Sequence, residues 1–182
     1  MGPFLAFSRA MDKVSGAFGW VADGCVMLAC LISAGNATVR YAFNYSSNAW
    51  LEVQWYLFAG IVMLGASYTL VRNEHVRVDL VYGALGTRGK LWVDIFGIIC
   101  FLLPAMVLLT WMTWPFFLDA FLRNEHSSNA GGLLRWPIKL LLPVGFLLLT
   151  LQGLAELIKR IALLRGIQPA GEVVVEYVRP EQ

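Results

Sequence analysis

Four long apolar stretches alternate with short polar ones along the chain, and they cover residues 20–43, 50–71, 91–118 and 136–164. A helix of about 20 apolar residues crosses the roughly 30 Å hydrocarbon core of a bilayer. Inside lipid the backbone groups of such a segment must also be hydrogen-bonded within it. The pattern therefore predicts an all-α integral membrane protein with four transmembrane helices, built as a single membrane domain over residues 1–182.

The polar stretch between the second and third spans, residues 72–90, is predicted to be an interfacial arm. Val76, Val78 and Leu80 alternate with charged residues as they would in a strand. A lone strand at the membrane surface would leave its backbone groups unpaired, which is costly. In a helix, Val76, Leu80 and Ala84 share one apolar stripe instead. We therefore predict a short amphipathic helix that lies in the interface plane.

Composition agrees with a membrane protein. The chain is 58% hydrophobic and only 14% charged, whereas soluble domains carry about 25% charged residues. The net charge of +2 gives no reason to expect nucleic-acid binding. Cys25, Cys30 and Cys100 lie in apolar spans without a C-x-x-C pair, which is typical of packing residues rather than of disulfides or metal ligands.

The first span could be read as a secretory signal peptide, because basic residues precede an apolar run. The run is longer than a signal peptide, however, and no small-residue cleavage site ends it. We therefore expect the span to remain in the mature protein.

Basic residues are unevenly distributed over the two sides of this four-span arrangement. Ten lie on the side of the termini, and four lie on the other, namely Arg40, Arg123, Arg135 and Lys139. Cytoplasmic loops of membrane proteins carry the excess of lysine and arginine. We therefore expect both termini and the arm to be cytoplasmic, and residues 119–135 to lie on the opposite side.

The sequence contains no recognisable catalytic constellation. The two histidines follow glutamates at 74–75 and 125–126, which the predicted topology places on opposite faces of the membrane, so they cannot share a metal ion. Haem ligation within a helical bundle would require histidines inside the spans. Phosphate-binding glycine loops and nucleophile elbows are also missing. We expect no enzyme activity, no metal and no cofactor.

Carboxylates near the span ends bear on whether the chain could transport a substrate alone. Asp23, Glu52, Asp94 and Glu156 all lie near the ends of predicted spans, whereas a coupling acid is expected near the midplane. Arg40 and Glu52 flank one short turn at similar depth. An intramembrane charge is costly unless it is paired, so we predict an ion pair between them.

Two motifs give the sequence a family resemblance. One is Glu74-His75-Val76-Arg77-Val78-Asp79-Leu80-Val81-Tyr82, which follows the second span. The other is Arg135-Trp136-Pro137-Ile138-Lys139, which leads into the fourth. Between residues 52 and 160 the chain resembles the small membrane subunit, DctQ type, of tripartite ATP-independent periplasmic (TRAP) transporters.

The resemblance implies a sodium-coupled transporter of three parts. A periplasmic binding protein delivers an organic anion, usually a carboxylate, to a large membrane subunit that moves by an elevator motion. The small subunit braces the fixed scaffold of the large one. Because a polar tail follows the fourth span, we expect the separate rather than the fused form, in a bacterial or archaeal cytoplasmic (inner) membrane. The rival interpretation is a self-contained four-helix transporter or exporter.

No substrate-binding residue is expected on this chain, but the resemblance and the polar positions together give structural or subunit-interaction candidates. These are Arg40, Glu52, Gln54, Trp55, Glu74, His75, Arg77, Asp79, Tyr82, Arg135, Trp136 and Lys139. Expected partners are the large membrane subunit, the binding protein and membrane lipids. For the arm two interpretations stay open: a rigid interfacial strut, or a solvated loop whose arginines set topology or touch anionic lipid.

Overall fold

The regular structure of the chain is helical throughout the part that a computed structural model describes, residues 2–45, 47–74, 85–129 and 131–167. The helices form four long rods, and in the third rod a π-helical turn joins two α-helices. The helices are α1 (Gly2–Phe43), α2 (Asn48–Arg72), α4 (Thr87–Gly97), the π-turn (Ile98–Leu102), α5 (Leu103–Leu122) and α6 (Trp136–Leu164). Four helical segments are long and apolar enough to cross a membrane, which confirms the predicted fold class.

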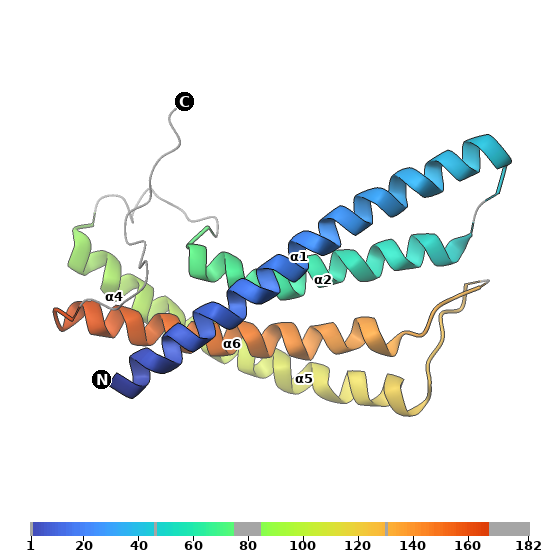
Figure 1. Cartoon of the computed structure of the whole chain (residues 1–182). Helices are drawn as coiled ribbons and strands as arrows, with labels where there is room; N and C mark the ends of the chain where they lie inside the picture. Colours follow the sequence, from blue (N-terminus) through green and yellow to red (C-terminus); the bar gives the residue numbers. More distant parts are fainter. Residues whose placement is uncertain (1, 46, 75–84, 130, 168–182) are drawn as a thin grey trace.

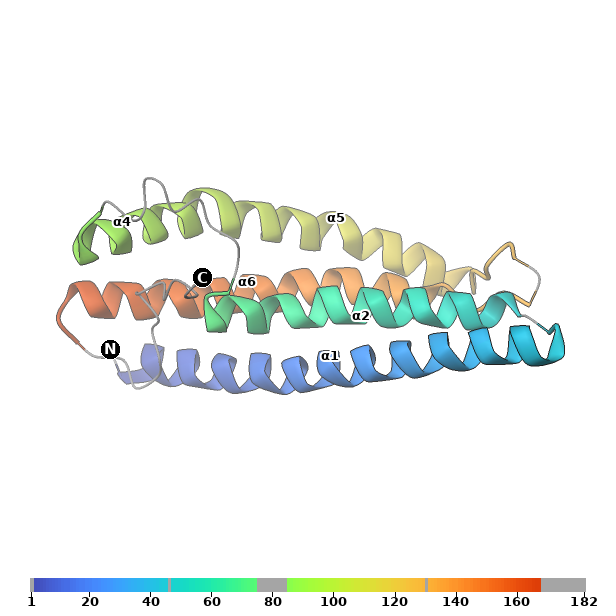
Figure 2. The ribbon, with the colours of Figure 1, turned by 90° about the horizontal axis from the view of Figure 1, so that it is seen from above.

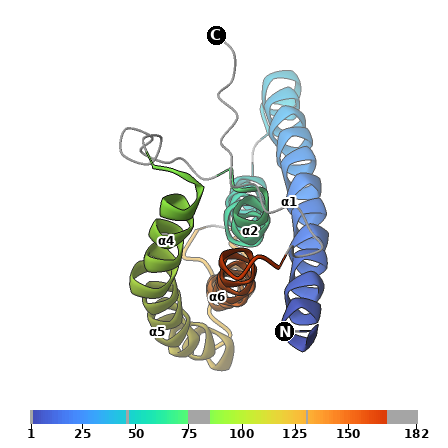
Figure 3. The same ribbon diagram turned by 90° about the vertical axis from the view of Figure 1, so that its left-hand side faces the viewer.

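The four rods form three layers (Figure 3). Helices α2 and α6 lie side by side in the middle, α1 packs on one side of them, and α4 and α5 pack on the other side against α6. Helix α1 crosses the bundle obliquely (Figure 1). The start of α1, α4 and the end of α6 lie together at one end, which we call the N-terminal end; the 44–47 turn and the 123–135 loop lie at the other, the loop end (Figure 2).

Local sequence explains where the middle helices begin and end. The hydroxyl of Ser47 accepts a hydrogen bond from the Ala49 N–H and caps the start of α2. Asn73 adopts the left-handed conformation, with φ of 57°, and ends the same helix. Helix α6 begins at Trp136 with Pro137 in its first turn, as predicted, because the missing N–H of proline costs nothing there.

Two glycines of α6 allow its neighbours to approach closely. A Cβ atom at Gly145 would lie 2.7 Å from Cβ of Met63, which is possible only without a side chain, so α2 and α6 meet there. At Gly153 a Cβ atom would overlap the Leu102 side chain, and this places the end of the π-turn directly against α6. Close backbone approach through small residues is how membrane helices gain packing energy.

The first and third helical segments are longer than the predicted spans. Residues 2–19, predicted as a lead before the first span, are helical and continuous with it, because their polar face packs on α6. Helix α5 continues to Leu122, so the loop that was predicted to begin at Asp119 begins at Arg123. Pro104 stands in the first turn of α5, directly after the π-turn.

The predicted interfacial arm is described only at its ends. Arg72 is the last residue of α2, and residues 87–90 form the first turn of α4. The centre of the arm, residues 75–84, lies outside the described residues.

Candidate functional site: two polar clusters at the ends of the bundle

A network of charged side chains joins α1, α4 and α6 at the N-terminal end. Nζ of Lys159 lies 3.0 Å from Oδ1 of Asp12 and also contacts the Glu156 carboxylate. Nε of Arg160 donates to Oδ2 of Asp94 at 2.9 Å, while its Nη1 contacts Glu156 as well. Glu156, Lys159 and Arg160 are each no more than 3% exposed. We call these five residues the ion network.

Gln152 extends the ion network by one turn toward the middle of the bundle. Its Oε1 accepts a hydrogen bond of 2.9 Å from the hydroxyl of Ser15. Its Nε2 donates to Asp12 at 2.9 Å and to Glu156 at 3.2 Å. Among the described residues, every buried side-chain nitrogen and oxygen has a hydrogen-bond partner. The polar atoms of this cluster therefore satisfy one another.

Electrostatics makes the network a fastening between helices. A charge taken out of water is stabilised only by well-placed partners, and removing one partner leaves the other uncompensated. Glu156 bridges the two cations within α6, while Asp12 and Asp94 reach them from α1 and α4. The relative position of three helices is thus fixed by directional contacts as well as by apolar packing.

Sequence reasoning missed this network. It used Lys159 and Arg160 only to orient the chain, and it treated Asp94 only as a carboxylate near the end of a span. A signal was present, because positions 152, 156, 159 and 160 fall on one face of an otherwise apolar helix. Their partners on α1 and α4 are too distant in sequence for periodicity to reveal them.

Glu52 organises the second cluster, at the loop end. Its Oε1 accepts hydrogen bonds from Nδ2 of Asn129, at 2.8 Å, and from the hydroxyl of Ser127. Its Oε2 accepts from the backbone N–H of Leu133 at 2.8 Å. The side chain lies in α2, and all three donors lie in the loop that joins α5 to α6. One carboxylate therefore holds this loop against the bundle.

Further contacts close the same loop. The Tyr56 hydroxyl donates to the backbone oxygen of Leu134 at 2.7 Å. The ammonium group of Lys139 contacts the Glu125 carboxylate and lies 4.0 Å from the centroid of the Phe116 ring. A hollow of about 280 Å³ opens beside these groups, lined by Glu52, Trp55, Tyr56, Ser127, Arg135, Ile138 and Lys139.

The predicted ion pair between Arg40 and Glu52 is wrong. Among the described residues Glu52 is bound by the 123–135 loop, and Arg40 is placed over the ring of Tyr41, 5.3 Å from its centroid. Arg40 stands in the last turn of α1 and is exposed. The equal depth of the two residues did not specify which way each side chain turns.

The other candidates are more dispersed. Arg135 lies 3.8 Å from Glu125, and Trp136 packs edge to face on Phe121 with 5.4 Å between ring centroids. Trp55 is exposed and Gln54 half-buried; Glu74 is exposed and lies 3.6 Å from Arg72. The remaining four lie outside the described residues: His75, Arg77, Asp79 and Tyr82.

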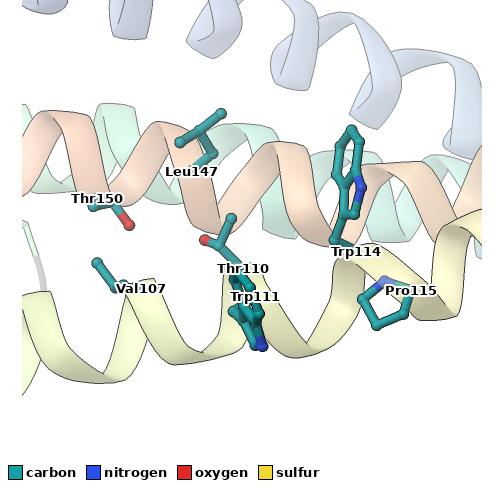
Figure 4. Close-up of a pocket in the computed structure, with 7 residues that line it drawn as sticks. All are labelled: Val107, Thr110, Trp111, Trp114, Pro115, Leu147 and Thr150. Atoms are coloured by element: carbon teal, nitrogen blue, oxygen red, sulfur yellow. The ribbon is translucent and has the colours of Figure 1, made fainter.

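An apolar groove of about 570 Å³ lies between α5 and α6 (Figure 4). Its two hydroxyl groups are occupied, because Thr110 donates to the backbone oxygen of Met106 at 2.7 Å and Thr150 donates to that of Phe146 at 2.8 Å. The groove therefore presents hydrocarbon and aromatic walls, formed by Val107, Thr110, Trp111, Trp114, Pro115, Leu147 and Thr150.

Four apolar helices, with polar clusters at both ends, define a multi-pass membrane protein. The family described as "Tripartite ATP-independent periplasmic transporters, DctQ component" matches residues 28–163, and the chain belongs to this family. It is thus a small subunit of a TRAP transporter, a transport component rather than an enzyme.

One relative illustrates the similarity. Over 92 residues the chain is 29% identical to the C4-dicarboxylate TRAP transporter small permease protein DctQ of Vibrio cholerae serotype O1. The match covers 49% of this chain and 40% of the relative, so the chain spans less than half the length of the curated relative that it matches. No solved structure matches the chain.

Proposed function

We propose that this small subunit acts as a brace: it holds the scaffold of a large permease subunit steady while that subunit moves an organic anion across the membrane. The transport is coupled to sodium, and a periplasmic binding protein delivers the anion. The complex resides in the cytoplasmic (inner) membrane, with both termini of the small subunit in the cytoplasm.

This proposal is supported by the polar contacts that join the helices at both ends of the bundle. A brace must keep its shape while its partner moves. The ion network ties α1 and α4 to α6, and Glu52 ties the 123–135 loop to α2. The cations of the ion network are buried, and sliding of the helices would leave them without their partners.

The proposed substrate class is a carboxylate. The Vibrio cholerae relative is named for C4-dicarboxylates, and the family resemblance of the sequence implies carboxylates in general. We assign selection of the anion to the other two components. Contact with the large subunit is proposed for exposed candidates such as Trp55 and Arg40, since Glu52 and Lys139 are engaged within the chain.

Reconstitution tests the division of labour. Proteoliposomes that contain this chain alone should take up no labelled C4-dicarboxylate under a sodium gradient. Those that also contain the large subunit, supplied with the binding protein, should do so. Sodium-driven uptake by the chain alone would instead support a self-contained transporter.

A variant tests the bracing role within the complex. Arg160→Ala removes one cation of the ion network, and Arg165→Ala removes an exposed one just beyond α6 as the matched control. If the chain is a brace, the Arg160 variant should co-purify with the large subunit while uptake falls, and the control should transport normally. Full uptake by a complex that contains the Arg160 variant would contradict the proposal.

A further inference from the structure

The π-turn at Ile98–Leu102 interrupts the third rod at a place where both halves of the rod touch the same neighbour. The N–H of Leu103 bonds to the oxygen of Ile98, five residues back, whereas an α-helix bonds four back. Before the turn, Asp94 meets Arg160 of α6. At its end, Leu102 covers Gly153 of α6.

The spacing of these contacts does not match on the two rods. On α6, Gly153 and Arg160 are seven residues apart, which leaves them about 20° apart around the axis of an α-helix. On the third rod, Asp94 and Leu102 are eight residues apart, which in a regular α-helix would separate them by about 80°. In two straight α-helices, one of the two contacts would therefore be turned away from its partner.

The π-turn accommodates one extra residue. The eight residues from Asp94 to Leu102 therefore rotate about the helix axis by the same angle as seven residues of a regular α-helix. Asp94 and Leu102 then lie within about 20° of each other, as their partners on α6 do. We propose that the π-turn is a register element: it brings α4 into phase with α5, and so it places Asp94 in the ion network. The extra residue is the exposed Cys100 or its neighbour Ile99, which is 47% exposed.

Deletions test this directly in the full-length chain, purified in detergent and followed by its melting temperature. Removal of Cys100 should turn the π-turn into a regular helix and leave both Asp94 and Leu102 facing α6. This variant should melt close to the Cys100→Ala control, and Asp94→Asn should lower the melting temperature in both backgrounds.

Removal of both Ile99 and Cys100 should rotate α4 by about 100° and withdraw Asp94 from Arg160. The melting temperature should fall, and Asp94→Asn should then cause no further loss. In this background position 93 takes the place of position 94. The paired exchange Val93→Asp with Asp94→Val should therefore raise the melting temperature of the two-residue deletion while lowering that of the parent.

The register role would be overturned if the paired exchange lowered the melting temperature of the two-residue deletion, or raised that of the parent. It would also be overturned by a Cys100 deletion that does not fold, or by one in which Asp94→Asn has no effect, because the proposal requires a regular helix to satisfy both contacts. The measurement depends only on this chain, so its failure leaves the brace proposal to be judged by transport.

Discussion

The hydroxyl of Ser15 donates a 2.9 Å hydrogen bond to the side-chain oxygen of Gln152, although the two residues are 137 positions apart and both are fully buried. The contact lies at the margin of the ion network and shows how the first helix is attached to the last.

Truncation of Lys159 should destabilise the bundle strongly. Lys159→Ala removes the cation shared by the buried Glu156 and by Asp12, whose side chain is 23% exposed. Breaking a fully buried pair costs about 3–5 kcal/mol, and the partial exposure of Asp12 should reduce the loss. Thermal unfolding in detergent measures the loss. The matched control is Lys13→Ala, which removes an exposed lysine next to Asp12 in sequence and should be close to neutral.

Glu52 and Arg40 should behave independently. Glu52→Ala leaves three donors of the 123–135 loop without their acceptor, so it should lower the melting temperature and expose the loop to protease. Arg40→Ala removes an exposed side chain and should change little. A double-mutant cycle should be additive; a coupling well above measurement error would show that the two residues do interact.

Gly145 should not tolerate even one added methyl group. In Gly145→Ala the new Cβ would lie 2.7 Å from Cβ of Met63 and 2.8 Å from its backbone oxygen, and overpacking of this kind typically costs about 1–3 kcal/mol. Gly24→Ala is the control, because nothing lies within 4 Å of that position and alanine favours helix. Equal melting temperatures for the two variants would contradict the close approach of α2 and α6.

Topology can be tested by labelling single cysteines from outside intact cells, in a background without Cys25, Cys30 and Cys100. Both Ala10→Cys and Ser128→Cys place the thiol at an exposed position. If both termini are cytoplasmic, an impermeant reagent should label position 128 and not position 10. The reverse pattern would invert the proposed orientation.

Hydropathy was sufficient to predict four membrane helices, because the cost of unsatisfied backbone in lipid leaves few alternatives. The start of α6 followed from Trp136-Pro137, whose chemistry is local. The partners of Glu52 did not follow, since they depend on the path of the 123–135 loop. The ion network was equally hidden, because Asp12 and Asp94 meet α6 only after the layers have assembled.

The π-turn is a second feature that the sequence did not predict. Pro104 lies next to the π-turn, but a proline in a sequence signals only a missing hydrogen bond. The irregularity is one extra residue in the third rod. Its role becomes evident only when the seven-residue spacing of Gly153 and Arg160 is compared with the eight-residue spacing of Asp94 and Leu102.

The distance between the two polar clusters also sets the bilayer thickness that this subunit fits. Lys139 at the loop end and Lys159 at the N-terminal end are twenty residues apart on α6, or about 30 Å along a helix axis. That is the thickness of an average hydrocarbon core. A thicker bilayer would draw buried charges into lipid and a thinner one would expose apolar side chains to water, each at a cost that rises with every ångström of mismatch. Acyl-chain length should therefore affect the stability of this subunit, with an optimum near the native thickness.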